Sequence, residues 1–77
     1  MRVAILTESA RAGDAIGNQV AEKAAFFLER GAEVRVFIES KKRLHPALGP
    51  YSVEVTQAEP EGDPWHFLAS ADLILVE

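Results

Sequence analysis

Short apolar runs and a stretch of helical periodicity alternate along the first half of the chain. The continuous apolar run at residues 3–6, closed by Thr7 and Glu8, is typical of a strand buried on both faces of a parallel sheet. At residues 15–30, apolar side chains recur at helical spacing and predict an amphipathic helix. A second apolar run at residues 34–38 predicts another strand. Strand, helix and strand in succession form a βαβ unit, so the expected class is α/β with a Rossmann-like parallel sheet.

Boundary signals support the predicted helix. Asp14 is the predicted N-cap, because a short carboxylate can accept a hydrogen bond from an unpaired N–H group of the first turn. Gly31 lies where a left-handed residue commonly ends a helix. After the second strand, residues 41–51 contain a charged run, two prolines and a glycine, which predict a loop with at most one helical turn. Residues 52–56 alternate and predict a half-exposed strand near a sheet edge.

The last part of the chain predicts a turn, a short helix and a strand. The turn is expected at residues 59–62. Asp63 followed by Pro64 predicts the N-cap and first turn of a helix that reaches about Ser70. Residues 73–76 are all apolar, which predicts a buried, central fourth strand. A complete domain of this class continues beyond such a strand, so residues 1–77 are expected to be the first half of a Rossmann-like domain in a longer chain.

Composition narrows the class of protein. Of 77 residues, 48% are hydrophobic and 26% charged, which excludes a disordered chain. The net charge of −4 argues against a nucleic-acid partner. The absence of cysteine excludes disulfides and a thiolate zinc site. No apolar run approaches the roughly 20 residues of a membrane span, and Glu8 interrupts the N-terminal run before it reaches signal-peptide length. A cytoplasmic protein without a membrane span is expected.

Candidate binding residues follow the predicted strands, because ligands of open parallel sheets bind at the carboxyl ends of the strands. Gly13 and Gly17 lie where the first loop enters the helix, whose free N–H groups favour anions. Two interpretations stay open. These glycines either let a phosphate approach the backbone, or Gly13 forms a turn and Gly17 allows close packing. Their spacing matches neither the dinucleotide fingerprint nor a P-loop.

Two carboxylates are candidates at the same sheet edge. Glu39 ends the second strand, where NAD-binding folds place an acid on the ribose. Glu8 follows the first strand and is suited to act as a base or to bind a hydroxyl. A solvated surface charge is the alternative for both residues.

The remaining polar and aromatic candidates are less specific. His45 and His66 lack neighbouring ligands, so no metal site is predicted. The basic run at residues 41–43 would attract a phosphate-bearing or acidic acceptor, or is a solvated loop. Trp65 and Phe67 are expected to fasten the short helix to the sheet, and a platform on which a sugar ring stacks is the alternative that the pattern favours less.

Several stretches together resemble the start of GT-B fold glycosyltransferases of the group 1, or family 4, type. The N-terminal strand MRVAIL is followed by a small-residue loop with Gly13 and by IGNQV, which opens the helix. The stretch LERGAEVRVF is similar to the usual helix end and second strand of that family, with Ala32 in place of the common histidine. The run ADLILV resembles its fourth strand.

The resemblance implies an enzyme of two Rossmann-like domains with the active site between them. The N-terminal domain would bind a sugar or lipid acceptor, and its first glycine loop would approach the diphosphate of a nucleotide-sugar donor. That role falls on Gly13 and Gly17, with Asp14 standing where the family often has a second glycine. Glu8 and Glu39 would lie on the acceptor side. The donor-binding residues belong to the C-terminal domain, so these 77 residues alone are expected to be inactive. No cofactor is implied, and no catalytic residue is identified.

Two other functions compete with this one. A dinucleotide-binding oxidoreductase domain would place Glu39 on the ribose, but the glycine fingerprint is missing. A non-enzymatic flavodoxin-like or receiver-like module would need an acidic cluster after the first strand, where Glu8 is the single acid.

Overall fold

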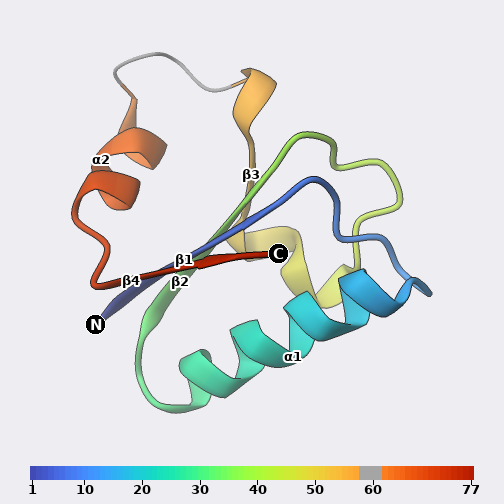
Figure 1. Ribbon diagram of the computed structural model, residues 1–77, viewed down its shortest axis with the longest axis horizontal. Coiled ribbons are helices and arrows are strands. Elements are labelled where there is room, and N and C mark those ends of the chain that lie inside the picture. Colours follow the sequence, from blue (N-terminus) through green and yellow to red (C-terminus); the bar gives the residue numbers. More distant parts are fainter. Residues whose placement is uncertain (58–61) are drawn as a thin grey trace.

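The computed structural model describes residues 1–57 and 62–77 and contains one parallel sheet with helices on both faces (Figure 1). Its elements in chain order are β1 (Arg2–Thr7), α1 (Ala15–Glu29), β2 (Glu33–Ile38), the 3-10 helix η1 (Pro46–Tyr51), β3 (Ser52–Glu54), the 3-10 helix η2 (Val55–Gln57), α2 (Asp63–Ala69) and β4 (Leu73–Val76). The predicted α/β class with a Rossmann-like parallel sheet is confirmed.

The strand order is β3-β2-β1-β4, and every pair of neighbouring strands is parallel. Val3 of β1 pairs with Val34 of β2 on one side and with Leu73 of β4 on the other. β2 pairs with one side of β1, and β3 pairs with the far side of β2. β4 then pairs with the other side of β1. The direction of strand addition therefore reverses between β1 and β4.

The two faces of the sheet bury separate apolar clusters because side chains alternate along each strand. Residues 3 and 5 of β1 and residues 34, 36 and 38 of β2 pack with α1 and η1. On the other face, Ala4 and Phe37 pack with Phe67 of α2. The prediction that Phe67 fastens the short helix to the sheet is confirmed.

α1 begins and ends where the sequence predicts, but the predicted N-cap hydrogen bond is not formed. Asp14 is the N-cap residue, but its carboxylate accepts no capping hydrogen bond. At the other end, Gly31 has φ +81°, and its N–H group donates to the Leu28 carbonyl oxygen at 3.0 Å. The helix therefore ends through a left-handed glycine, as predicted.

β3 is shorter than the strand predicted at residues 52–56, because its partner ends first. β3 begins opposite Val36, and β2 stops at Ile38, so only three residues find a parallel partner. The following residues turn into η2. Upstream, η1 is longer than the single turn expected, and Ser52 supports its end by donating a hydrogen bond to the Leu48 carbonyl oxygen at 2.8 Å.

α2 starts one residue earlier than the pattern predicts. Gly62 is the N-cap residue, so Asp63 is the first helical residue and Pro64 the second. The helix ends at Ala69, with Ser70 as its C-cap. Of the turn predicted at residues 59–62, only Gly62 lies within the described residues.

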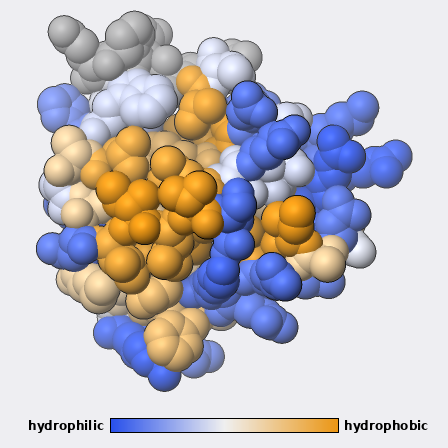
Figure 2. All heavy atoms as spheres, viewed as in Figure 1, coloured by the Kyte–Doolittle hydropathy of each residue, from blue (hydrophilic) through white to orange (hydrophobic). Residues whose placement is uncertain are grey.

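β4 is an edge strand in the described sheet and is not buried there; its predicted central position refers to a complete domain and stays a prediction. Its only partner in the described part of the chain is β1, and its side chains facing the α2 side remain uncovered. Ile74 is 48% exposed and Val76 77% exposed. Figure 2 shows hydrophobic side chains gathered over this strand. The start of β4 is held by Asp72, which exchanges two 2.8 Å hydrogen bonds with the Arg2 backbone.

Candidate functional site

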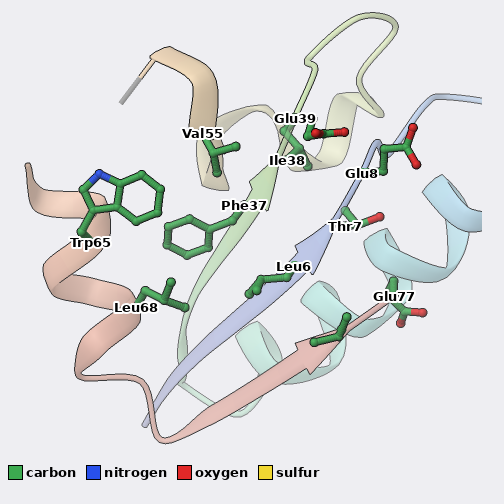
Figure 3. A pocket seen from close by; sticks show the side chains of 11 residues that line it. Leu6, Thr7, Glu8, Phe37, Ile38, Glu39, Val55, Trp65, Leu68 and Glu77 are labelled. Carbon is green, nitrogen blue, oxygen red and sulfur yellow. The ribbon is translucent and has the colours of Figure 1, made fainter. Parts of the chain in front are cut away.

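A groove of about 370 Å³ lies at the carboxyl ends of the strands, on the face that α2 covers (Figure 3). Its lining comes from the ends of β1, β2 and β4 and from η2 and α2. The lining residues are Leu6, Thr7, Glu8, Phe37, Ile38, Glu39, Val55, Trp65, Leu68, Val76 and Glu77. Because β1 and β4 both contribute, the groove includes the point where strand order reverses, the usual ligand position in open α/β sheets.

The floor and walls of the groove are apolar. Leu6 and Phe37 rise from the sheet, and Trp65 and Leu68 face them from α2 (Figure 3). The Phe37 and Trp65 rings are 6.3 Å apart between centroids, with an interplanar angle of 28°. Val55 of η2 closes the side next to β2. The groove therefore presents aromatic and aliphatic surface to a ligand.

Three carboxylates stand at the polar end of the groove, where the strands finish (Figure 3). Backbone hydrogen bonds continue past the ends of the strands and hold the residues that carry these carboxylates next to one another. The Glu39 N–H group donates to the Glu8 carbonyl oxygen at 3.1 Å, and the Glu77 N–H group donates to the Leu6 carbonyl oxygen at 2.9 Å. The sequence-predicted candidates Glu8 and Glu39 are therefore brought to one edge of one groove.

The three carboxylates differ in their partners. Glu77 forms an ion pair with Lys23 of α1, which places a cation beside it. Glu8 and Glu39 are exposed, and neither side chain forms an ion pair or hydrogen bond with another described residue. Nearby, the Thr7 hydroxyl is occupied in the turn, because it donates to the Ser9 carbonyl oxygen at 3.0 Å. Glu8 and Glu39 thus remain available to a ligand.

The glycine loop lies apart from this groove. Gly13, Asp14 and Gly17 are absent from its lining. A Cβ atom on Gly17 would lie 2.0 Å from the Arg11 carbonyl oxygen, so this glycine allows the loop backbone to pack on the first turn of α1. Gly13 is exposed, with φ +85° and open space around its Cα. Of the two glycines, Gly13 is the one that a diphosphate could approach.

The histidines take no part in a metal site within the described residues. His45 caps η1, since its Nδ1 atom accepts a 3.2 Å hydrogen bond from the Ala47 N–H group. His66 is exposed on α2. Residues 1–57 and 62–77 contain no group of three or more potential metal-ligating side chains. In the same residues, no helix has the length and apolar character needed to cross a membrane.

Sequence reasoning missed that Trp65, Val55 and Leu68 line the groove together with Phe37. The sequence favours an anchoring role for Trp65 over a sugar-stacking platform; Trp65 does stack on Phe37, but it also faces the groove. The available signal in the sequence is the aromatic pair Trp65 and Phe67 at the start of the predicted helix. Whether this pair lines a groove depends on which face of the sheet α2 covers, and the sequence does not determine that face.

Comparison with protein-family models, with curated proteins and with solved structures finds no match to this chain. The groove and the residues around it are therefore the features that indicate a function.

Proposed function

We propose that the groove binds the sugar ring of an acceptor and that the chain is the acceptor-side unit of a nucleotide-sugar-dependent glycosyltransferase. The observation that carries this proposal is the pairing of Glu8 and Glu39 with an aromatic surface at the strand-order reversal. Sugar hydroxyls donate hydrogen bonds to carboxylates, and the C–H faces of a sugar ring pack on apolar and aromatic side chains.

The charge of the groove is unfavourable for a donor diphosphate. None of the described residues that line the groove is basic, and three are carboxylates. Like charges repel, so an anionic group is disfavoured there, whereas a neutral sugar is not. Exposed Gly13, before the N-terminus of α1, is the candidate for the diphosphate contact that the resemblance implies.

The expected chemistry follows from these positions. Glycosyl transfer forms a bond between an acceptor hydroxyl oxygen and the anomeric carbon of the donor sugar. The bond from that carbon to the donor diphosphate breaks, the nucleoside diphosphate leaves with the bonding electrons, and the acceptor hydroxyl loses its proton. Glu8 or Glu39 is suited to accept that proton while orienting the hydroxyl. Because both carboxylates lie at the polar end of the groove, the reacting hydroxyl would point toward the carboxyl edge of the sheet.

A dinucleotide site is the second candidate, because Glu39 directly follows β2, where a ribose-binding acid is found in dinucleotide-binding folds. The packing of the first loop argues against it. In dinucleotide sites, glycines of this loop admit the pyrophosphate to the backbone, whereas the open side of Gly17 is filled by the Arg11 backbone.

The test is a backbone-amide NMR titration of the 77-residue chain with simple methyl glycosides, and separately with NAD. Methyl glycosides at millimolar concentrations should shift the amide signals of Glu8 and Glu39 and the indole signal of Trp65. Glu39→Gln keeps the shape and removes the charge, so it should weaken binding roughly three- to tenfold, as expected for loss of a charge-assisted hydrogen bond at a partly exposed site.

The matched control is Glu29→Gln at the exposed C-terminal end of α1, far from the lining of the groove. It removes the same charge and should leave the affinity unchanged. Equal weakening by both variants would mean that general charge, not Glu39, determines binding. NAD binding without any response to methyl glycosides would replace this proposal with the dinucleotide site.

A further inference from the structure

Two loops at the carboxyl edge lie side by side and are joined through their backbones (Figure 1). Residues 8–14 link β1 to α1, and residues 39–45 link β2 to η1; the parts 9–14 and 40–45 are together called the basic loop pair. The Ala12 N–H group donates to the Arg43 carbonyl oxygen at 2.7 Å. The His45 N–H group donates to the Ala10 carbonyl oxygen at 2.8 Å, which completes a short antiparallel bridge.

The junction gathers positive charge. It brings Arg11 to the basic run Lys41, Lys42 and Arg43, and all four residues are exposed. Half of the eight Lys and Arg residues of the chain are therefore in this pair of loops. Within residues 9–14 and 40–45 Asp14 is the single acid, so these segments carry a formal charge of +3 in a chain of −4, with Glu8 and Glu39 directly before them. None of the four cations forms an ion pair with another described residue.

The backbone that carries these cations is held in place at several points. The Lys41 N–H group donates to Glu54 Oε1 at 3.0 Å, and the Lys42 N–H group donates to Ser40 Oγ at 3.2 Å. Arg43 has φ +57°, a conformation that residues other than glycine adopt only where their surroundings hold them. The Arg11 backbone packs against Gly17. A ligand would therefore meet cations on ordered loops, which lowers the entropic cost of binding.

We infer that the basic loop pair binds a phosphate or diphosphate group. Arginine and lysine are the side chains that bind such groups most directly, by paired hydrogen bonds and by charge. The basic loop pair contains Gly13, so this inference extends the diphosphate contact of the proposed function to named side chains. The site is separate from the groove, so pyrophosphate binding can fail while methyl glycosides still bind, and the reverse.

The first test is titration of the 77-residue chain with inorganic pyrophosphate at low ionic strength, followed by backbone-amide NMR. Shifts should concentrate in residues 10–12 and 41–45. Arg11→Gln and Lys42→Gln should each weaken binding about three- to fivefold, because each removes one exposed charge contact. Arg30→Gln is the matched control, because Arg30 is an exposed cation at the end of α1 and should leave the affinity unchanged.

The contribution of Arg11 is decisive, because it comes from the other loop. If Lys42→Gln weakens binding and Arg11→Gln does not, the joint site is refuted. Shifts spread over all cations, or equal weakening by Arg30→Gln, would refute it as well. These NMR spectra also report whether each variant remains folded, and the map of shifts in the unaltered chain tests the site without any substitution.

A second arm identifies the source of the phosphate. Vesicles of phosphatidylglycerol present it on a lipid surface, and phosphatidylcholine vesicles serve as the neutral control. Binding of pyrophosphate without vesicle binding indicates a soluble phosphate-bearing ligand. Binding of the anionic vesicles that is weakened by both variants indicates a lipid head group. Binding of neither pyrophosphate nor anionic vesicles overturns the inference.

Discussion

The substitution Gly17→Ala tests the packing that positions the first loop. A Cβ atom at residue 17 would lie 2.0 Å from the Arg11 carbonyl oxygen and 2.8 Å from its carbonyl carbon. Non-bonded atoms pack at roughly 3.5 Å, so the loop would have to move by about 1.5 Å. The obstructing atoms are backbone, and the backbone of the next residue, Ala12, is hydrogen bonded to Arg43. Rotation of a side chain therefore cannot relieve the clash.

One favourable and two unfavourable contributions set the change in the free energy of unfolding. Alanine is favoured over glycine inside a helix by about 1 kcal/mol. Overpacking costs roughly 1–3 kcal/mol. Moving the Arg11 carbonyl also weakens the 3.3 Å hydrogen bond that it accepts from Asp14, whose N–H group donates to it; a lost hydrogen bond costs about 1 kcal/mol. The net expectation is a loss of about 2 kcal/mol in the free energy of unfolding, or roughly 10 °C in Tm for a domain of this size.

The assay is thermal and urea unfolding followed by circular dichroism, with Gly49→Ala as the matched control. Gly49 has no atom within 4 Å of its Cβ position and no positive φ, so the same substitution there should be neutral or slightly stabilising. A Gly17→Ala variant as stable as the unaltered chain would show that the Arg11 backbone does not rest on α1. A loss of pyrophosphate affinity in a folded Gly17→Ala variant is expected, because Arg11 would be displaced.

Two further substitutions test the α2 side of the sheet. Phe67→Ala removes the buried ring that packs on Ala4 and Phe37 and should cost about 3–5 kcal/mol in unfolding free energy, whereas Phe26→Ala, at an exposed ring, should cost less than about 1 kcal/mol by the same melts. The exposed apolar edge of β4 is expected to make the unaltered chain self-associate at high concentration, and Ile74→Lys, which places a charge there, should reduce that association in sedimentation velocity. If Phe67→Ala and Phe26→Ala cost the same, or if Ile74→Lys associates as strongly as the unaltered chain, the corresponding assignment is wrong.

The sequence predicts well what depends on neighbours along the chain. The periodicity of α1 and the left-handed Gly31 are local signals, and both are confirmed. The length of β3 is not local, because it depends on β2 ending at Ile38. The exposure of β4 is not local either. An apolar run indicates a strand suited to burial, but its partners decide whether it lies inside a sheet or at an edge.

The candidate site likewise has parts that the sequence predicts and parts that depend on how distant segments pack. Glu8 and Glu39 could be paired from the sequence, because the ends of adjacent parallel strands meet at one edge. Trp65 and Val55 could not be added, because their positions depend on the face that α2 covers and on the turn after β3. The meeting of Arg11 with residues 41–43 was also hidden, since it results from a bridge between two irregular loops.

The arrangement of charge at the carboxyl edge links the two proposals in physical terms. The groove has an apolar floor and an acidic rim, and the basic loop pair lies beyond that rim. A neutral hydroxylated ring is suited to the groove, and a phosphate is suited to the basic loop pair. A ligand that carries both groups would be oriented with its ring over Phe37 and its phosphate toward Arg11. If the two sites bind such a ligand together, Arg11→Gln will weaken binding of a sugar phosphate but not of a methyl glycoside, and equal weakening of both ligands would show that the two regions do not act separately.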